Sequence, residues 1–142
     1  MNKYIFLLAF CFMGNFLFAP AKAAIHSEAG SNPIKKIVKE IAKSNVYEIN
    51  STTGYRETLS QQSTRYQQLL KIATAEQLTE LAMKNKNAVV RLYAFQGLVN
   101  KLKEIPKEIV DQFRNDTSTI DVLKGNIAEK VSLNKVASGL LY

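Results

Sequence analysis

His26 is the residue on which any acid–base chemistry would have to depend, because it is the only histidine among 142 residues. It stands beside Ser27 and Glu28. A catalytic triad needs a nucleophile, a base and an orienting acid that converge in space, and proximity in sequence does not provide this. The chain also has a single cysteine, Cys11, which excludes an intrachain disulfide framework and zinc sites built on clustered cysteines. We therefore expect no catalytic role for His26 and no metal site.

Two pairs of carboxylates have a spacing that acid–base catalysis could use. Glu76 and Glu80 are four residues apart on one predicted helix, and Glu104 and Glu108 flank Pro106. Both pairs are surrounded by lysines, which is typical of a solvated helix surface rather than a shared cleft. The sequence also has no Gly-rich phosphate loop and no nucleophile elbow. The protein is therefore predicted not to be an enzyme and to use no cofactor.

Basic residues dominate one predicted helix, over residues 33–44. Asn32 is a plausible cap, Pro33 suits the first turn, and Ile34, Ile37, Val38 and Ile41 recur at helical spacing. The lysines fall away from this apolar face: Lys35, Lys36, Lys39 and Lys43. They could bind an anionic surface or an acidic partner. The simpler interpretation, which we favour, is that they face water while the apolar side packs on the core.

Residues 1–23 are predicted to be a secretory signal peptide. An apolar run of roughly 15 residues follows Lys3, which is shorter than the about 20 residues that a membrane-spanning helix needs. Cleavage is expected after Ala21 or Ala23, with Ala23 favoured, and Phe10 before Cys11 argues against a lipoprotein. We expect an exported chain, periplasmic or secreted, without a transmembrane anchor after cleavage. Nucleic acid is then not an expected partner, although 19 Lys and Arg outnumber 12 Asp and Glu.

A flexible N-terminus over residues 24–32 is expected to precede a helical domain over residues 33–142. Further helices are predicted at 56–72, 74–85 and 87–102 and from Pro106 to about Asn115, with a loop over residues 45–55, which contain the run from Asn50 to Gly54. Thr74 and Gln77 form a capping box, and Asn87 can cap the following helix.

The tail over residues 118–142 fits two patterns. Ser118 and Asp121 resemble a second capping box, and the apolar residues after them keep helical spacing: Ile120, Leu123, Ile127 and Val131. Gly125-Asn126 would instead allow a hairpin turn. We favour the helix, which makes the predicted fold all-α, with about five to six helices.

The helix over 87–102 carries the pattern of a known repeat. Val90-Arg91 is followed by small Ala94 and by Gly97-Leu98, and this resembles the second helix of a HEAT repeat. The best-matching unit is 74–102, where Leu78, Leu81 and Ala82 match the first helix. The chain also resembles small exported HEAT-like proteins of Bacteroidetes. The resemblance implies an array of helical hairpins (an α–α superhelix) and no particular activity.

Binding of a partner protein is the function that such an array favours, since its helices present an extended surface. The partner would be an envelope or extracellular protein of unknown identity. Arg91 and Gln96 are the predicted contact residues on the central unit, although Arg91 in this motif more often stabilises the repeat. The alternative is binding of anionic lipid or cell-wall polymer by the segment Lys35–Lys43.

Overall fold

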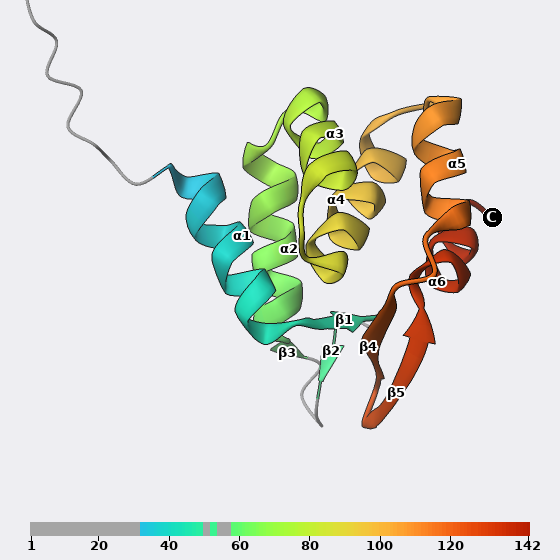
Figure 1. Ribbon diagram of the computed structural model, residues 1–142. Helices are drawn as coiled ribbons and strands as arrows, with labels where there is room; N and C mark the ends of the chain where they lie inside the picture. Colours follow the sequence, from blue (N-terminus) through green and yellow to red (C-terminus); the bar gives the residue numbers. More distant parts are fainter. Residues whose placement is uncertain (1–31, 50–51, 54–57) are drawn as a thin grey trace, which may run out of the picture.

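A bundle of helices stands over a small β-sheet in the computed structural model, which describes residues 32–49, 52–53 and 58–142 (Figure 1). The helices of this part of the chain are α1 (Pro33–Ser44), α2 (Gln61–Ile72), α3 (Ala75–Lys84), α4 (Ala88–Lys101), α5 (Lys107–Asn115) and α6 (Leu133–Gly139). The strands are β1 (Val46–Glu48), β2 (Thr52–Thr53), β3 (Thr58–Leu59), β4 (Thr119–Lys124) and β5 (Ile127–Ser132). The protein is thus mostly helical, and the prediction of a purely all-α fold was wrong.

Helix starts follow the capping residues that the sequence offers. Asn32 caps α1 by accepting a hydrogen bond from the Ile34 amide at 3.0 Å, with Pro33 in the first turn. Thr74 and Gln77 form the predicted capping box of α3. Asn87 caps α4 through the Val90 amide at 2.9 Å. These predicted helix starts are confirmed. Each cap satisfies a backbone amide that has no hydrogen-bond partner within the helix.

The second predicted helix begins later than expected. Within the predicted range of 56–72, Thr58 and Leu59 belong to β3, which pairs antiparallel with β2. Helix α2 starts at Gln61, after Ser60 accepts a hydrogen bond from the Ser63 amide at 2.9 Å. The segment predicted as a loop around 45–55 likewise contains β1 and β2.

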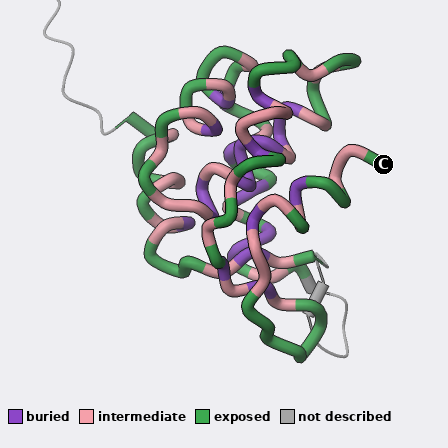
Figure 2. The backbone as a smooth tube through the Cα atoms, turned by 45° about the vertical axis from the view of Figure 1, so that its right-hand side comes forward, coloured by how far each residue is buried: buried purple, intermediate pink, exposed green. Residues whose placement is uncertain are grey.

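Helix α4 is the centre of the bundle, with α1 and α2 to its left and α5 and α6 to its right in Figure 1. Most of its apolar side chains are buried, and Figure 2 shows buried residues concentrated along the middle of the molecule. Gly97 permits the close approach of α3, because a Cβ at this position would lie 3.1 Å from Leu78 Cδ1. Gly97, a small residue of the repeat pattern, therefore allows α3 and α4 to pack closely.

The three-stranded sheet joins segments that are far apart in the sequence, in the order β1-β4-β5. β1 pairs parallel with β4, with Val46 opposite Asp121, and β4 pairs antiparallel with β5. The outer edge of β1 is bonded by side chains: Gln62 Nε2 donates to the Val46 carbonyl at 2.9 Å, and the Glu48 amide donates to Tyr93 Oη at 3.0 Å. The sheet is therefore tied to α2 and α4.

The favoured helix over the tail was wrong, and the hairpin alternative is correct for residues 119–132. Ile120 and Val122 alternate with more exposed residues and are buried against the helices. Gly125 adopts a φ of 61° at the turn, which glycine tolerates best. Ser118 does not cap a helix; its amide donates to Asp116 Oδ1 at 2.9 Å. Helix α6 follows only from Leu133.

Several predictions concern residues outside the described part of the chain: the signal peptide over 1–23, its cleavage point, residues 24–31 and His26. Within residues 32–49, 52–53 and 58–142, no helix has both the length and the apolar character needed to cross a membrane.

Candidate functional site

Arg91, one of the two predicted contact residues of the central unit, is occupied by bonds within the fold. Its guanidinium donates to Asp116 Oδ2 at 2.6 Å, to Ser118 Oγ at 3.3 Å and to the Asn85 carbonyl at 3.1 Å. The side chain is only 14% exposed. Arg91 therefore joins the α3–α4 turn to the segment between α5 and β4, which is the structural role anticipated for it.

Asp116 is the acidic partner of Arg91 and ends α5. Burial raises the pKa of its carboxyl, but hydrogen bonds from Ser118 and from Arg91 together with the charge of Arg91 outweigh this, so that the pKa is lowered overall. The carboxylate is thereby kept ionised within a contact that holds α4 against α5.

Gln96, the other predicted contact residue, is partly buried on α4. Its Oε1 is inaccessible to solvent and has no hydrogen-bond partner in the part of the chain that the structure describes. The side chain borders two hollows, one toward the sheet and α6 and one toward α2. Gln96 and Arg91 thus lie on the same helix without forming a common surface.

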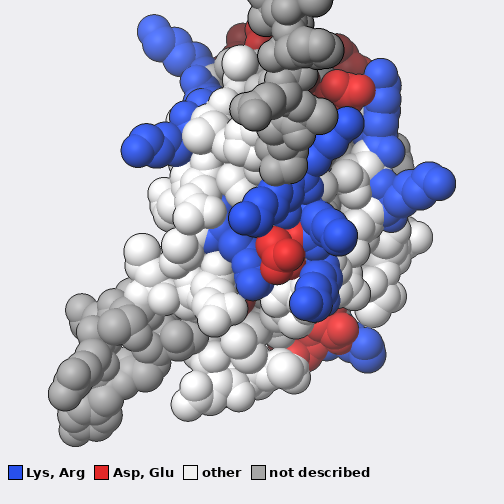
Figure 3. Space-filling model, turned by 90° about the vertical axis from the view of Figure 1, so that its left-hand side faces the viewer, with Lys and Arg blue, Asp and Glu red and all other residues white. Residues whose placement is uncertain are grey.

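The predicted lysine face is present on α1. Ile41 is fully buried in the core, so the lysines on the opposite side of the helix face solvent. All four are exposed: Lys35, Lys36, Lys39 and Lys43. Figure 3 views the molecule from the left-hand side of Figure 1 and shows many basic and few acidic side chains there.

Helix α1 is held in this orientation at both ends. Asn32 caps its start, and Asn45 ends it in the left-handed conformation with a φ of 52°. The Asn45 side chain then accepts a hydrogen bond from Asn87 Nδ2 at 2.8 Å, which ties the end of α1 to the α3–α4 turn. The lysines are therefore presented by a helix whose rotation is fixed by its packing and its caps.

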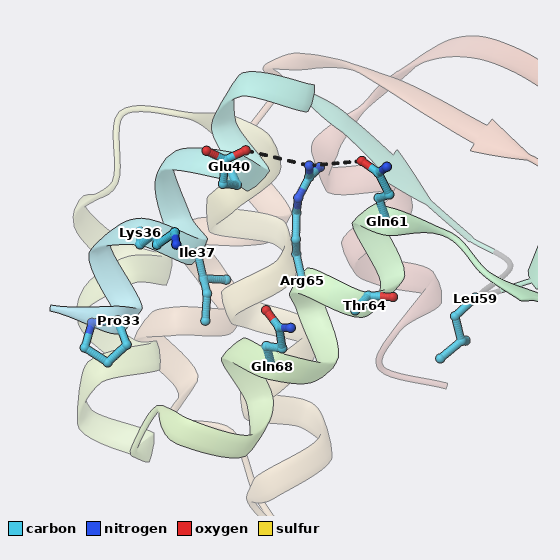
Figure 4. Close-up of a pocket in the computed structure, with 9 residues that line it drawn as sticks. All are labelled: Pro33, Lys36, Ile37, Glu40, Leu59, Gln61, Thr64, Arg65 and Gln68. Carbon is cyan, nitrogen blue, oxygen red and sulfur yellow. Dashed lines mark hydrogen bonds and ion pairs between the residues drawn. The ribbon is translucent and has the colours of Figure 1, made fainter. Parts of the chain in front are cut away.

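A groove of about 520 Å³ runs between α1 and α2 (Figure 4). Its apolar part is formed by Pro33 and Ile37 of α1 and by Leu59, which is 53% exposed. Its polar wall comes from both helices: Lys36, Glu40, Gln61, Thr64, Arg65 and Gln68. The groove thus offers apolar contacts beside cationic side chains.

Positive charge dominates this side of the molecule. Helices α1 and α2 carry six basic residues and a single acidic one, Glu40. Glu40 lies 3.7 Å from Arg65 Nη2, and Arg65 also donates to Gln61 Oε1 at 3.3 Å (Figure 4). An exposed ion pair of this kind contributes under about 1 kcal/mol, so Glu40 offsets little of the surrounding charge.

The two predicted carboxylate pairs lie on exposed helix surface or loop. Hydrogen bonds from Thr74 and from its own backbone lower the pKa of Glu76 at the start of α3. Glu80, Glu104 and Glu108 are also exposed. No group of three His, Cys, Asp or Glu side chains suited to a metal ion occurs within the residues that the structure describes.

Several groove residues were missed by the sequence analysis, namely Leu59, Thr64, Arg65 and Gln68. Helix α2 is rich in glutamine and polar on most of its surface, so its sequence gives little indication of the side that borders α1. Arg65 is its one cation before the last turn and was the only available signal.

Searches for similar proteins give no match of this chain to a family, to a curated protein or to a solved structure.

Proposed function

We propose that this protein is a non-catalytic interaction module that binds an acidic segment of a partner protein on the face formed by α1 and α2. The exposed lysines Lys35, Lys36, Lys39 and Lys43 provide the charge, and the groove beside them provides apolar contact area. We further propose that the helices form a HEAT-like array. The repeat pattern around Arg91, the close contact of Gly97 with Leu78 and the hairpin of α3 and α4 support this.

The observation that carries the proposal is the combination of an apolar groove, lined by Lys36 and the Arg65–Glu40 pair, with the further exposed lysines of α1. A purely apolar groove would suit many partners, and isolated surface lysines would suit none in particular. Ile37 and Leu59 lie beside Lys36 and Arg65 in one groove. An extended or helical peptide with carboxylates and a few large apolar side chains complements both features.

The site of action in this proposal is the periplasm or the exterior of the cell. This rests on the leader-like sequence of residues 1–23, with its apolar run and its small residues at Ala21 and Ala23. The partner would accordingly be an envelope or extracellular protein.

A second candidate function is binding of anionic lipid or cell-wall polymer by the lysine face itself. One observation favours it: Lys35 borders the opposite side of α1, toward α3, so the lysines extend beyond the α1–α2 groove. A polymer or membrane would contact this whole face and would not need the groove. Its attraction would be almost wholly electrostatic and therefore strongly weakened by salt.

The test is affinity capture and crosslinking with envelope extract at low and high salt, combined with two variants. Thr64→Trp fills the groove from an exposed position of α2 without changing charge. The triple change of Lys35, Lys36 and Lys39 to Gln removes the charge. A matched control changes Lys101, Lys103 and Lys124 to Gln, since these lysines are exposed and lie outside the groove.

The proposal expects one protein with an acidic segment to be recovered stoichiometrically at both salt concentrations. Its recovery should be lost with Thr64→Trp, weakened by the triple change and unaffected by the control. Recovery of lipid or wall polymer alone, lost at high salt and indifferent to Thr64→Trp, would instead establish the second function and refute the first.

A further inference from the structure

Two adjoining hollows lie where α4 meets the sheet, α2 and α6, and they share no residue with the α1–α2 groove. The first, of about 380 Å³, lies between the sheet and α6 and is mainly apolar. The second, of about 240 Å³, lies between β1, α2 and α4 and is mainly polar. Ile49 and Gln96 border both. We call the pair the Gln96 cleft, and its size suits a small ligand.

Two tyrosines that line the polar hollow have hydroxyl protons that no group of the described residues accepts. Tyr66 Oη accepts a bond from Asn100 Nδ2 at 2.6 Å, and Tyr93 Oη accepts one from the Glu48 amide at 3.0 Å. Neither hydroxyl donates to another group of the described residues. Burial raises the pKa of both phenols, to about 12 for Tyr66, so both keep their protons at neutral pH. Because both residues line the hollow, each can offer its proton to an oxygen of a ligand bound there.

Gln96 carries an acceptor, its amide oxygen, that lacks a hydrogen-bond donor. Its Oε1 is buried without a partner in the described part of the chain, and Gln96 lines both hollows. A buried amide oxygen without a partner is unfavourable, and a rotation of the side chain that turns Oε1 into either hollow would let a ligand donor satisfy it. A hydroxyl group both donates and accepts, so it satisfies the Gln96 amide in either orientation and also the two phenols.

The apolar hollow supplies the other half of the recognition. Its walls include Val122 from β4, Val131 from β5, and Val136 and Leu140 from α6. Ile49, which is 49% exposed, stands at its junction with the polar hollow. An alkyl chain that enters there would remove apolar surface from water on both sides of the contact.

We propose that the Gln96 cleft binds a neutral amphiphile, with a hydroxyl-rich head in the polar hollow and an alkyl chain in the apolar one. Glu48 lines the polar hollow with its carboxylate bonded to Ser60 Oγ, and none of the described residues that line this hollow is Lys or Arg. An anionic head would therefore meet a carboxylate and no cation, which favours an uncharged head. A short alkyl glycoside has this chemistry. Binding of this ligand in the Gln96 cleft does not depend on the binding of a partner protein to the α1–α2 face.

Titration of the full chain with hexyl β-glucoside below its micelle concentration, followed by amide NMR shifts, tests the proposal. Saturable shifts around Ile49, Gln96 and Val136 are expected. Methyl β-glucoside lacks the alkyl chain and hexyl sulfate replaces the neutral head, and each should bind at least about tenfold more weakly. An absence of saturable shifts, or equal affinity for hexyl sulfate, would overturn the proposal.

Variants connect the binding to the cleft. An added Cβ at Gly139 meets nothing within 4 Å, so Gly139→Leu can occupy space at the apolar hollow without disturbing the fold. Gly139→Leu should lower the affinity for hexyl β-glucoside by at least about tenfold. Tyr66→Phe should reduce the preference of the protein for hexyl β-glucoside over hexyl sulfate. Lys124→Gln, which lies outside both hollows, is the control. Unchanged affinity in a folded Gly139→Leu variant would show that the ligand binds elsewhere.

Discussion

Arg91 Nη2 lies 2.6 Å from Asp116 Oδ2, and this contact joins two segments that are 25 residues apart in the sequence. Arg91 belongs to the first turns of α4, and Asp116 ends α5 directly before the β4–β5 hairpin. Ser118 Oγ lies 3.3 Å from the same guanidinium nitrogen. The contact therefore fixes the position of the C-terminal hairpin relative to the central helices.

Replacing Arg91 with Leu should lower the free energy of unfolding by about 2 kcal/mol, because Asp116 would stay in a largely enclosed site without its cation. Urea denaturation followed by circular dichroism measures this. Lys130→Ala is the matched control, since Lys130 pairs with Asp121 but is 74% exposed, and it should cost under about 1 kcal/mol. Equal losses in the two variants would contradict a structural role of the buried pair.

Acid should weaken the same contact. Since the pKa of Asp116 is lower in the folded protein than the about 3.9 of an unfolded aspartate, the unfolded state binds more protons in acid. The stabilisation is fully present above the unfolded pKa and is lost as the pH falls through the folded one. Denaturation midpoints measured downward from about pH 5 should therefore fall less steeply for Asp116→Asn than for the native chain. Parallel curves for the two proteins would refute this.

The helices were largely predictable because their signals are local. Asn32, Thr74 and Asn87 mark helix starts through bonds to amides two or three residues away. The apolar spacing of Ile34 to Ile41 requires only that one side of a helix be covered. Neither kind of signal depends on distant parts of the chain, so both can be recognised in the sequence.

The sheet was not predictable to the same degree, because its pairing is long-range. β1 has only three residues and pairs with β4 across more than half of the described chain, with Tyr47 opposite Val122. In the tail, the spacing of Ile120, Leu123 and Ile127 also satisfies a helix. Val122 is fully buried although it lies outside that helical series. Burial of every second residue, Ile120 and Val122, is the pattern of a strand.

The candidate site was predictable only on α1. The lysine positions follow from the periodicity of one helix, whereas the groove depends on which side of α2 packs beside it. Arg91 was assigned its structural role through the repeat resemblance, but Asp116 as its partner emerges only from the fold. Gln96 was chosen for its place on α4, and the hollows beside it are formed by β1, α2 and α6.

Substitution by alanine should have different effects on the stability of the protein at Gly97 and at Gly139, although both residues lie in helices. Alanine in place of glycine favours a helix by about 1 kcal/mol. At Gly97 the new Cβ would lie 3.1 Å and 3.3 Å from the two methyl carbons of Leu78, which is fully buried and cannot retreat into solvent. Gly97→Ala should therefore be destabilising by about 1 kcal/mol net, and Gly139→Ala should be neutral or stabilising. Thermal unfolding of both variants measures the difference, and stabilisation by Gly97→Ala would show that the α3–α4 contact is loose.

Gln62 should be the polar residue of α2 on which the sheet depends most. The residue is only 2% exposed, and its Nε2 donates to the Val46 carbonyl at 2.9 Å and to the Ile41 carbonyl at 3.4 Å. Gln62→Leu keeps most of the volume but leaves both carbonyls without this donor, which should cost about 1–3 kcal/mol.

Gln68→Leu provides the control for Gln62→Leu, because Gln68 is an exposed glutamine on the same helix and has no such bond to β1. It should change stability by under about 0.5 kcal/mol. Amide hydrogen exchange adds a local measurement: the Ile49 amide, which donates to the Leu123 carbonyl at 3.0 Å, should lose protection in Gln62→Leu and keep it in Gln68→Leu. Retained protection in both variants would mean that β4 holds β1 in place without α2, since the β1–β4 ladder would then be stable on its own.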